Sequence, residues 1–84
     1  MPEKISEEKL PKIDKEILEL LTKEGEPIST YEVGKRIDIS WSTANTHLMN
    51  LQIKGLVESE ERESKGKKSR MWWVEQNSLD EFTG

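Results

Sequence analysis

Residues 28–57 read ISTYEVGKRIDISWSTANTHLMNLQIKGLV, and this stretch decides the fold. It contains Ser29-Thr30-Tyr31-Glu32, a pattern in which a Ser hydroxyl and a Glu carboxylate each bond a backbone N–H at the start of a helix. After a short polar break, Ser40 can cap a further helix over residues 41–54, and Gly55 is of the type that commonly ends one. The stretch therefore predicts two helices separated by a tight turn.

The longer of these helices has two chemically different sides, because successive residues turn by ~100°. The side predicted to face the core is apolar, with Ala44, Leu48 and Leu51. The opposite side is polar and carries no Asp or Glu: Ser42, Thr46 and Asn50, flanked by Asn45 and Met49. Asn can pair with adenine in a major groove, and Ser and Thr hydroxyls bond bases or phosphates. In an arbitrary protein, the same side chains would simply form a solvated helix surface.

The flanking segments complete the predicted architecture. Before the central stretch, Ile13, Ile17, Leu20 and Leu21 form the apolar stripe of an amphipathic helix that starts at Pro11 and ends at Gly25. After Gly55 the period of the pattern changes to two, which predicts strands over residues 56–62 and 70–75. The segment between them contains Lys65, Gly66, Lys67 and Lys68, so the hairpin is expected to have a long cationic tip.

The central stretch resembles the helix-turn-helix of winged-helix transcription regulators, especially the ArsR and MarR types and small archaeal or archaeal-virus relatives. The resemblance lies in Gly34, the turn at Ile39-Ser40, His47-Leu48 with Leu51, and Gly55-Leu56-Val57. It implies an α+β fold, a winged helix-turn-helix with three helices followed by a two-stranded β-hairpin wing. It also implies that Trp72 and Val74 lie in the core, whereas Met71 and Trp73 lie on the other face of their strand.

The function implied by the resemblance is that of a sequence-specific, double-stranded DNA-binding transcriptional regulator. The third helix would enter the major groove, while the basic wing and the end of the second helix would lie on the phosphate backbone. The predicted DNA-binding residues are Lys35, Arg36, Ser40, Ser42, Asn45, Thr46, Asn50, Lys65, Lys67, Lys68 and Arg70. With about four to six phosphate contacts, the logarithmic salt slope of binding would be roughly −4 to −5.

The domain organisation is expected to be simple. Residues 1–10 are predicted to form a flexible arm, residues 11–76 the winged domain, and residues 77–84 a tail or short helix anchored by Leu79 and Phe82. One small module offers a footprint of only about 600–1,000 Å² on DNA, so we expect a homodimer on a near-palindromic site. The first helix with the arm, or the C-terminal apolar residues, are the candidate pairing surfaces.

Composition argues against several other classes of protein. The 84 residues allow one modest core, and they include no Cys and a single His. We therefore predict no metal site and no cofactor, and a half-buried, hydrogen-bonded role for His47. With no nucleophile–base pair and no phosphate-binding Gly loop, the chain is not expected to be an enzyme. No apolar run is long enough to cross a membrane and no secretory signal is recognisable, so a cytoplasmic protein is expected.

A winged helix used for protein docking is the alternative prediction. It is favoured by the net charge of −4 and by Met49 and Ile53 on the helix side assigned to DNA. Ile53 lies almost opposite the core stripe, where it would meet the wing or a second subunit. Trp41 is expected to plug the edge of the core. The acidic group Glu58, Glu60, Glu61 and Glu63 is expected to be a solvated face.

Overall fold

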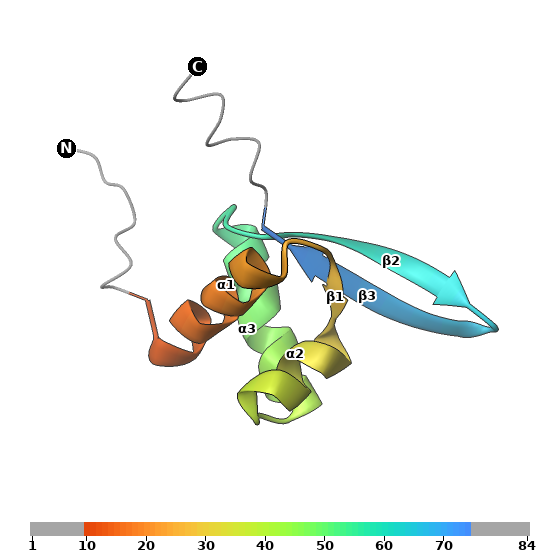
Figure 1. The fold of residues 1–84 in the computed structure, drawn as a ribbon, viewed down its shortest axis with the longest axis horizontal. Helices are drawn as coiled ribbons and strands as arrows, with labels where there is room; N and C mark the ends of the chain where they lie inside the picture. Colours follow the sequence, from red (N-terminus) through yellow and green to blue (C-terminus); the bar gives the residue numbers. More distant parts are fainter. Residues whose placement is uncertain (1–9, 75–84) are drawn as a thin grey trace, which may run out of the picture.

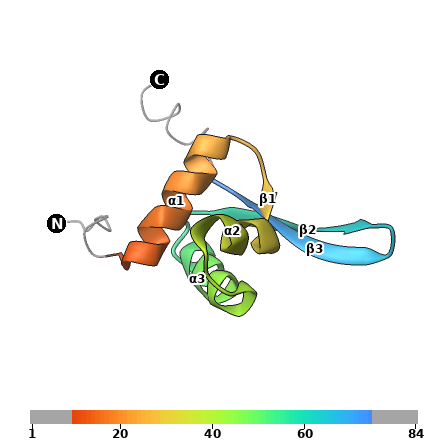
Figure 2. The ribbon, with the colours of Figure 1, turned by 60° about the horizontal axis from the view of Figure 1, so that its bottom comes forward.

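The computed structural model describes residues 10–74. The elements follow the order α1 (Lys12–Glu24), β1 (Ile28–Ser29), α2 (Thr30–Ile37), α3 (Trp41–Ile53), β2 (Glu58–Ser64) and β3 (Lys67–Trp73). The three helices gather into one body, and the β2–β3 hairpin projects from it (Figure 1). In the turned view, α1 crosses above α2 and α3 while the hairpin extends to one side (Figure 2). This arrangement confirms the predicted α+β class and the winged helix-turn-helix.

The serine caps of α2 and α3 are formed as the sequence predicts, but the Glu32 carboxylate, predicted to bond a backbone N–H, accepts a hydrogen bond from Arg36 instead. The Ser29 hydroxyl accepts a hydrogen bond of 3.1 Å from the backbone N–H of Glu32, and Ser40 caps α3 through the N–H of Thr43, also at 3.1 Å. Gly25 follows α1 in the left-handed conformation with φ 70°. Each of these groups pairs a backbone N–H or C=O that a helix end would otherwise leave free.

The sheet has one strand more than the two-stranded wing predicted. Its order is β1-β3-β2, all neighbours antiparallel, and Ile28 of β1 lies opposite Trp72 of β3. Two residues are too few to show the period of two by which strands are recognised in a sequence. The added strand joins the base of the wing to the start of α2.

The predicted long tip of the hairpin is wrong. Ser64 pairs directly with Lys67, so the turn consists of Lys65 and Gly66 alone, at φ 54° and 80°. Positive φ at both central residues is typical of the tight turn whose twist matches that of paired strands. The strands therefore include polar residues that were predicted to form a loop. An exposed two-stranded ribbon does not need apolar side chains at its end, so polarity did not distinguish strand from loop here.

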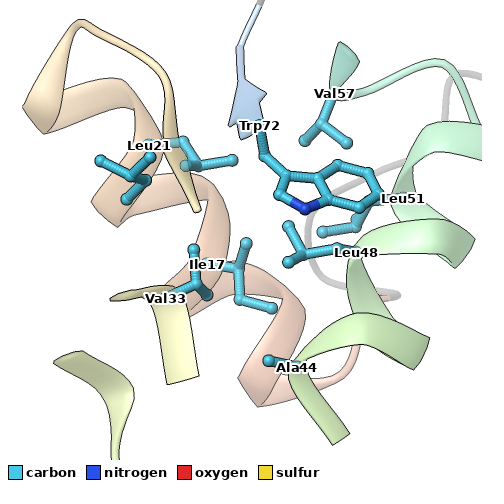
Figure 3. Close-up of a cluster of buried hydrophobic side chains, with 9 residues drawn as sticks. Ile17, Leu21, Val33, Ala44, Leu48, Leu51, Val57 and Trp72 are labelled. Atoms are coloured by element: carbon cyan, nitrogen blue, oxygen red, sulfur yellow. The ribbon is translucent and has the colours of Figure 1, made fainter. Parts of the chain in front are cut away.

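The core lies between the three helices and the base of the wing (Figure 3). Trp72 is fully buried, and its indole N–H donates a hydrogen bond of 2.8 Å to the buried hydroxyl of Thr30. Val74 packs against the same core, as predicted, and Met71 and Trp73, at alternate positions of β3, are half-buried. The buried residues around Trp72 come from every helix and from the approach to the wing: Ile17, Leu21, Ile28, Val33, Ala44, Leu48, Leu51 and Val57.

Gly34 marks the close contact between α2 and the turn that leads to α3. A Cβ at this position would lie 2.9 Å from the carbonyl oxygen of Ile39 and 3.7 Å from the Cβ of Ala44. The first distance is shorter than carbon and oxygen atoms tolerate without a shift of the backbone. A residue without a side chain therefore sets the spacing between the two helices of the motif.

The predicted arm and tail lie almost entirely beyond the two ends of the described region. Leu10, the last residue of the predicted arm, is buried. Residues 1–9 and 75–84 lie outside the described residues, and so does the predicted short helix around Leu79 and Phe82. Within residues 10–74, no helix combines the length and the apolar character needed to cross a membrane.

Candidate nucleic-acid interface

α3 presents a polar outer face, built by the two-sided pattern of its sequence. Ala44, Leu48 and Leu51 are fully buried against the body of the protein. The side chains predicted to read DNA lie on the other sides of the helix: Ser42, Thr46 and Asn50 are exposed, and Asn45 is half-buried. No carboxylate is present among the 13 residues of α3. A polyanion approaching this face would meet hydrogen-bonding groups without an opposing charge from the helix itself.

The first turn of α3 carries a cluster of hydroxyl groups. Ser40 donates a hydrogen bond of 2.9 Å to Thr43 Oγ1, and its Oγ lies 3.4 Å from that of Ser42. Because the Ser40 hydroxyl also caps the helix, its first role is to hold this turn together. Ser42 and Thr46 line a shallow hollow beside it, together with Thr43 and His47.

His47 connects α3 to α1. Its Nδ1 forms a hydrogen bond of 2.7 Å with Oδ1 of Asp14, a carboxylate that is only 2% exposed. The half-buried, hydrogen-bonded His47 predicted from the sequence is therefore confirmed. Its partner was missed, although Asp14 stands at helical spacing from the core residues Ile17 and Leu21. Among residues 10–74, no three His, Asp or Glu side chains gather as a metal ion would require.

The two cations at the end of α2 have different surroundings. Arg36 donates hydrogen bonds to Glu24 at 2.8 Å and to Glu32 at 2.9 Å, so its guanidinium already bridges two carboxylates. The hydrogen bond to Glu24, with that to Glu32, raises the pKa of Arg36 above its ordinary value. Lys35 instead extends over the ring of Tyr31, with Nζ 6.0 Å from the ring centroid. Lys35 is therefore better placed than Arg36 to meet a phosphate.

The cations of the wing are exposed, but they lie beside an acidic strand. Lys65 is in the turn, and Lys67, Lys68 and Arg70 follow on β3, all exposed. The strand register sets Glu61 opposite Arg70 and Glu63 opposite Lys68. The acidic residues of β2 are exposed, as predicted, yet their position next to the basic strand was not foreseen. The wing is thus a ribbon of paired opposite charges with its surplus of cations at the turn.

A hydrogen-bonded chain ties the wing to the end of α3. Arg70 donates to the hydroxyl of Ser59 at 3.0 Å, and that hydroxyl donates to Oε1 of Gln52 at 3.0 Å. The link orients the wing relative to the outer face of α3. A rigid relation between the two elements is what simultaneous contact with a groove and an adjacent phosphate strand would require.

Comparison with known proteins agrees with this geometry. Residues 10–58, more than half of the chain, match the family model described as winged helix-turn-helix DNA-binding. The chain belongs to this family. The matched residues comprise all three helices of the winged helix and reach the first residue of the wing. The comparison with curated proteins gave no significant match.

Solved structures show the same winged-helix fold. A possible transcriptional regulator from Methanosarcina mazei Go1 superposes with a TM-score of 0.73 at 17% identity, over 86% of this chain and 62% of that one. For the zinc-responsive MarR family member ZitR of Lactococcus lactis, the TM-score is 0.69 at 20% identity, over 95% and 54% of the respective chains. Stf76 from the Sulfolobus islandicus plasmid-virus pSSVx gives 0.68 at 18% identity, over 93% and 100%. The chain spans less than two thirds of the first two neighbours.

The expectation that Trp41 plugs the core edge is wrong. Trp41 is 55% exposed. With Tyr31 and Met49 it lines a hollow between α3 and the wing, bordered on the far side by Lys68 and Arg70. Ile53 is 81% exposed and does not line this hollow. The winged helix therefore carries apolar as well as polar groups on the surface assigned to DNA.

Proposed function

We propose that this winged helix-turn-helix protein is a sequence-specific regulator of transcription that binds double-stranded DNA. α3 would enter the major groove, and the wing would lie along the phosphate backbone. The observation that carries the proposal is the carboxylate-free outer face of α3, with its exposed Ser42, Thr46 and Asn50, next to the exposed cations of the wing. Membership of a DNA-binding family supports it.

The roles of the side chains follow from their chemistry. Asn45 and Asn50 carry the amide that pairs with adenine, and Ser42 and Thr46 carry hydroxyls that bond bases or phosphates. Lys35, Lys65, Lys67, Lys68 and Arg70 would hold phosphates and thereby fix the position of the protein without selecting sequence. Ser40 and Arg36 would contribute less, because the first caps α3 and the second is paired with two carboxylates.

A homodimer is part of the proposal, because one winged helix of this size covers too little DNA for high selectivity. Two copies related by a twofold axis would place their α3 helices in successive major grooves, about 34 Å apart on a near-palindromic site. α1 and the two ends of the chain are the candidate pairing surfaces, since α3 and the wing are assigned to DNA.

Selection of duplexes from a random pool tests the proposal. The protein is expected to enrich one site, and Asn45→Ala and Thr46→Ala should each weaken binding to that site by roughly 5- to 150-fold, the range for loss of a good base contact. Binding to random duplex should change much less, because a single hydroxyl contact to a phosphate contributes little beside the cations of the wing. Affinities can be measured by fluorescence anisotropy with labelled duplexes.

Thr22→Ala is the matched control, because Thr22 is an exposed threonine on α1 and away from the α3 face. Because α1 is also a candidate pairing surface, this comparison uses a duplex with a single half-site, for which Thr22→Ala should leave the affinity unchanged. Failure to enrich any site, or equal losses for all three variants, would contradict base reading by α3. A protein partner that binds tightly, with an affinity unchanged by substitution of the wing lysines, would favour the docking role. The exposed apolar side chains of Met49 and Ile53 are the observation that supports this role.

A further inference from the structure

The hollow between α3 and the wing concentrates exposed apolar side chains. Four large apolar or aromatic residues are notably exposed in the described part of the chain: Tyr31 at 65%, Trp41 at 55%, Met49 at 50% and Ile53 at 81%. Three of them line this one hollow, and only Ile53 does not. Exposed apolar groups gathered in one place mark a surface that another molecule covers.

The hollow has a regular order along α3. Trp41, Asn45 and Met49 are spaced by four residues, so they lie one above the other on the same side of the helix. The amide nitrogen of Asn45 donates to the sulfur of Met49 at 3.6 Å, which holds the amide against the thioether. The amide of Asn45, which can pair with adenine, thus has an apolar side chain one helical turn before it and another one helical turn after it.

The opposite wall indicates the charge of the occupant. Lys68 and Arg70 reach the hollow from β3, and Lys35 lies over Tyr31 on the side of α2. Glu61, opposite Arg70 in the strand register, is the acidic residue of the lining. Two cations in the lining, with Lys35 next to Tyr31, fit a molecule with both apolar and anionic parts, as DNA has, better than the apolar face of a protein helix.

We infer that this hollow reads the 5-methyl groups of thymine, so that the protein selects a run of A·T pairs. The inference rests on the proposed function and names its substrate class. In the major groove an A·T pair presents the N6 and N7 groups of adenine beside the methyl group of thymine. Asn45 supplies the amide for the first, while Met49 and Trp41 supply the apolar contact for the second.

The test replaces thymine by uracil, which removes the methyl group and keeps base pairing and charge. The probes are the duplex selected from the random pool and the same duplex with uracil at every thymine. The wild-type protein should bind the uracil duplex more weakly, by about fourfold for each methyl group that it covers. Met49→Ala and Trp41→Ala should weaken binding to the thymine duplex and reduce the difference between the two probes.

Two further variants separate apolar contact from other effects. Met49→Leu keeps an apolar side chain of similar volume and should retain the preference for thymine. Ile53→Ala removes an exposed apolar side chain of α3 outside the hollow and should also retain it. Because the side chains changed are all exposed, the variants should fold, and circular dichroism spectra identical to that of the wild type would verify this.

The outcomes distinguish the inference from the function on which it rests. If no duplex is enriched or retained, the proposed function fails and the inference with it. If a duplex is bound but lacks an A·T run, or if thymine and uracil probes bind equally, the inference is overturned while DNA binding stands. A thymine preference lost in Ile53→Ala but kept in Met49→Ala would also overturn it.

Discussion

Trp72→Ala is expected to lower the free energy of unfolding by about 3–5 kcal/mol, a large part of the stability of so small a domain. Trp72 is fully buried among residues from all three helices, so its removal leaves a cavity that the helices cannot fill without losing their own contacts. The hydroxyl of Thr30 would also lose the indole N–H that now donates to it. Urea denaturation followed by far-ultraviolet circular dichroism measures the change.

Trp73→Ala is the matched control for this prediction. Trp73 is the next residue on β3 but points to the other face of the strand and is only half-buried. Its replacement should cost about 1 kcal/mol, the ordinary value for a point substitution. Equal losses for the two variants would show that Trp72 does not hold the helices and the wing together.

The double substitution Lys67→Glu with Lys68→Glu is expected to weaken binding to any duplex by roughly 100-fold at low salt, because it places repulsive charges where phosphates would lie. Both lysines are exposed next to the two-residue turn of the wing. The logarithmic salt slope should become less negative by about 1.8, close to nine-tenths for each lost contact. Anisotropy titrations at several salt concentrations give both quantities.

Lys12→Glu with Lys23→Glu makes the same change of net charge on α1, where both lysines are exposed. On a duplex with a single half-site, where pairing through α1 plays no part, these substitutions should alter affinity by less than about threefold, since they affect only the overall field of the protein. If they weaken binding as much as the wing substitutions do, net charge rather than phosphate contact by the wing would be the cause.

The salt slope also tests which cations take part. The sequence predicts a slope of roughly −4 to −5 from about four to six phosphate contacts. Arg36 is held by Glu24 and Glu32, and two of the wing cations lie opposite glutamates. With Arg36 excluded, the five remaining cations would give a wild-type slope of roughly −4.5, to which Lys67 and Lys68 contribute about 1.8.

Much of the helical part of the fold was predictable, because it depends on local signals. Ser29 and Ser40 cap their helices with their own hydroxyls, and the buried stripe of α3 follows directly from its helical spacing. Gly34 is one of the residues on which the resemblance rests, and the carbonyl oxygen of Ile39 fills the place of its missing side chain. Each of these features involves residues close together in the chain.

The features that the sequence did not reveal depend on contacts between distant residues. β1 is a strand only because Ile28 and Ser29 lie beside β3, more than 40 residues away in the chain. The buried Asp14 was missed because its partner, His47, is 33 residues away. The burial of an indole at a helix start depends on how the preceding turn packs. The sequence does not reveal this packing, so the burial of Trp41 was predicted wrongly.

Joint contact of the outer face of α3 and the wing with duplex DNA is the central claim. Titration of the isotope-labelled protein with the selected duplex, followed by amide chemical shifts in ¹H–¹⁵N NMR spectra, tests this claim most directly. The largest shifts are expected at Ser42, Asn45, Thr46 and Asn50 and at residues 65–70 of the wing. Shifts confined to α1, with α3 and the wing unchanged, would contradict the claim.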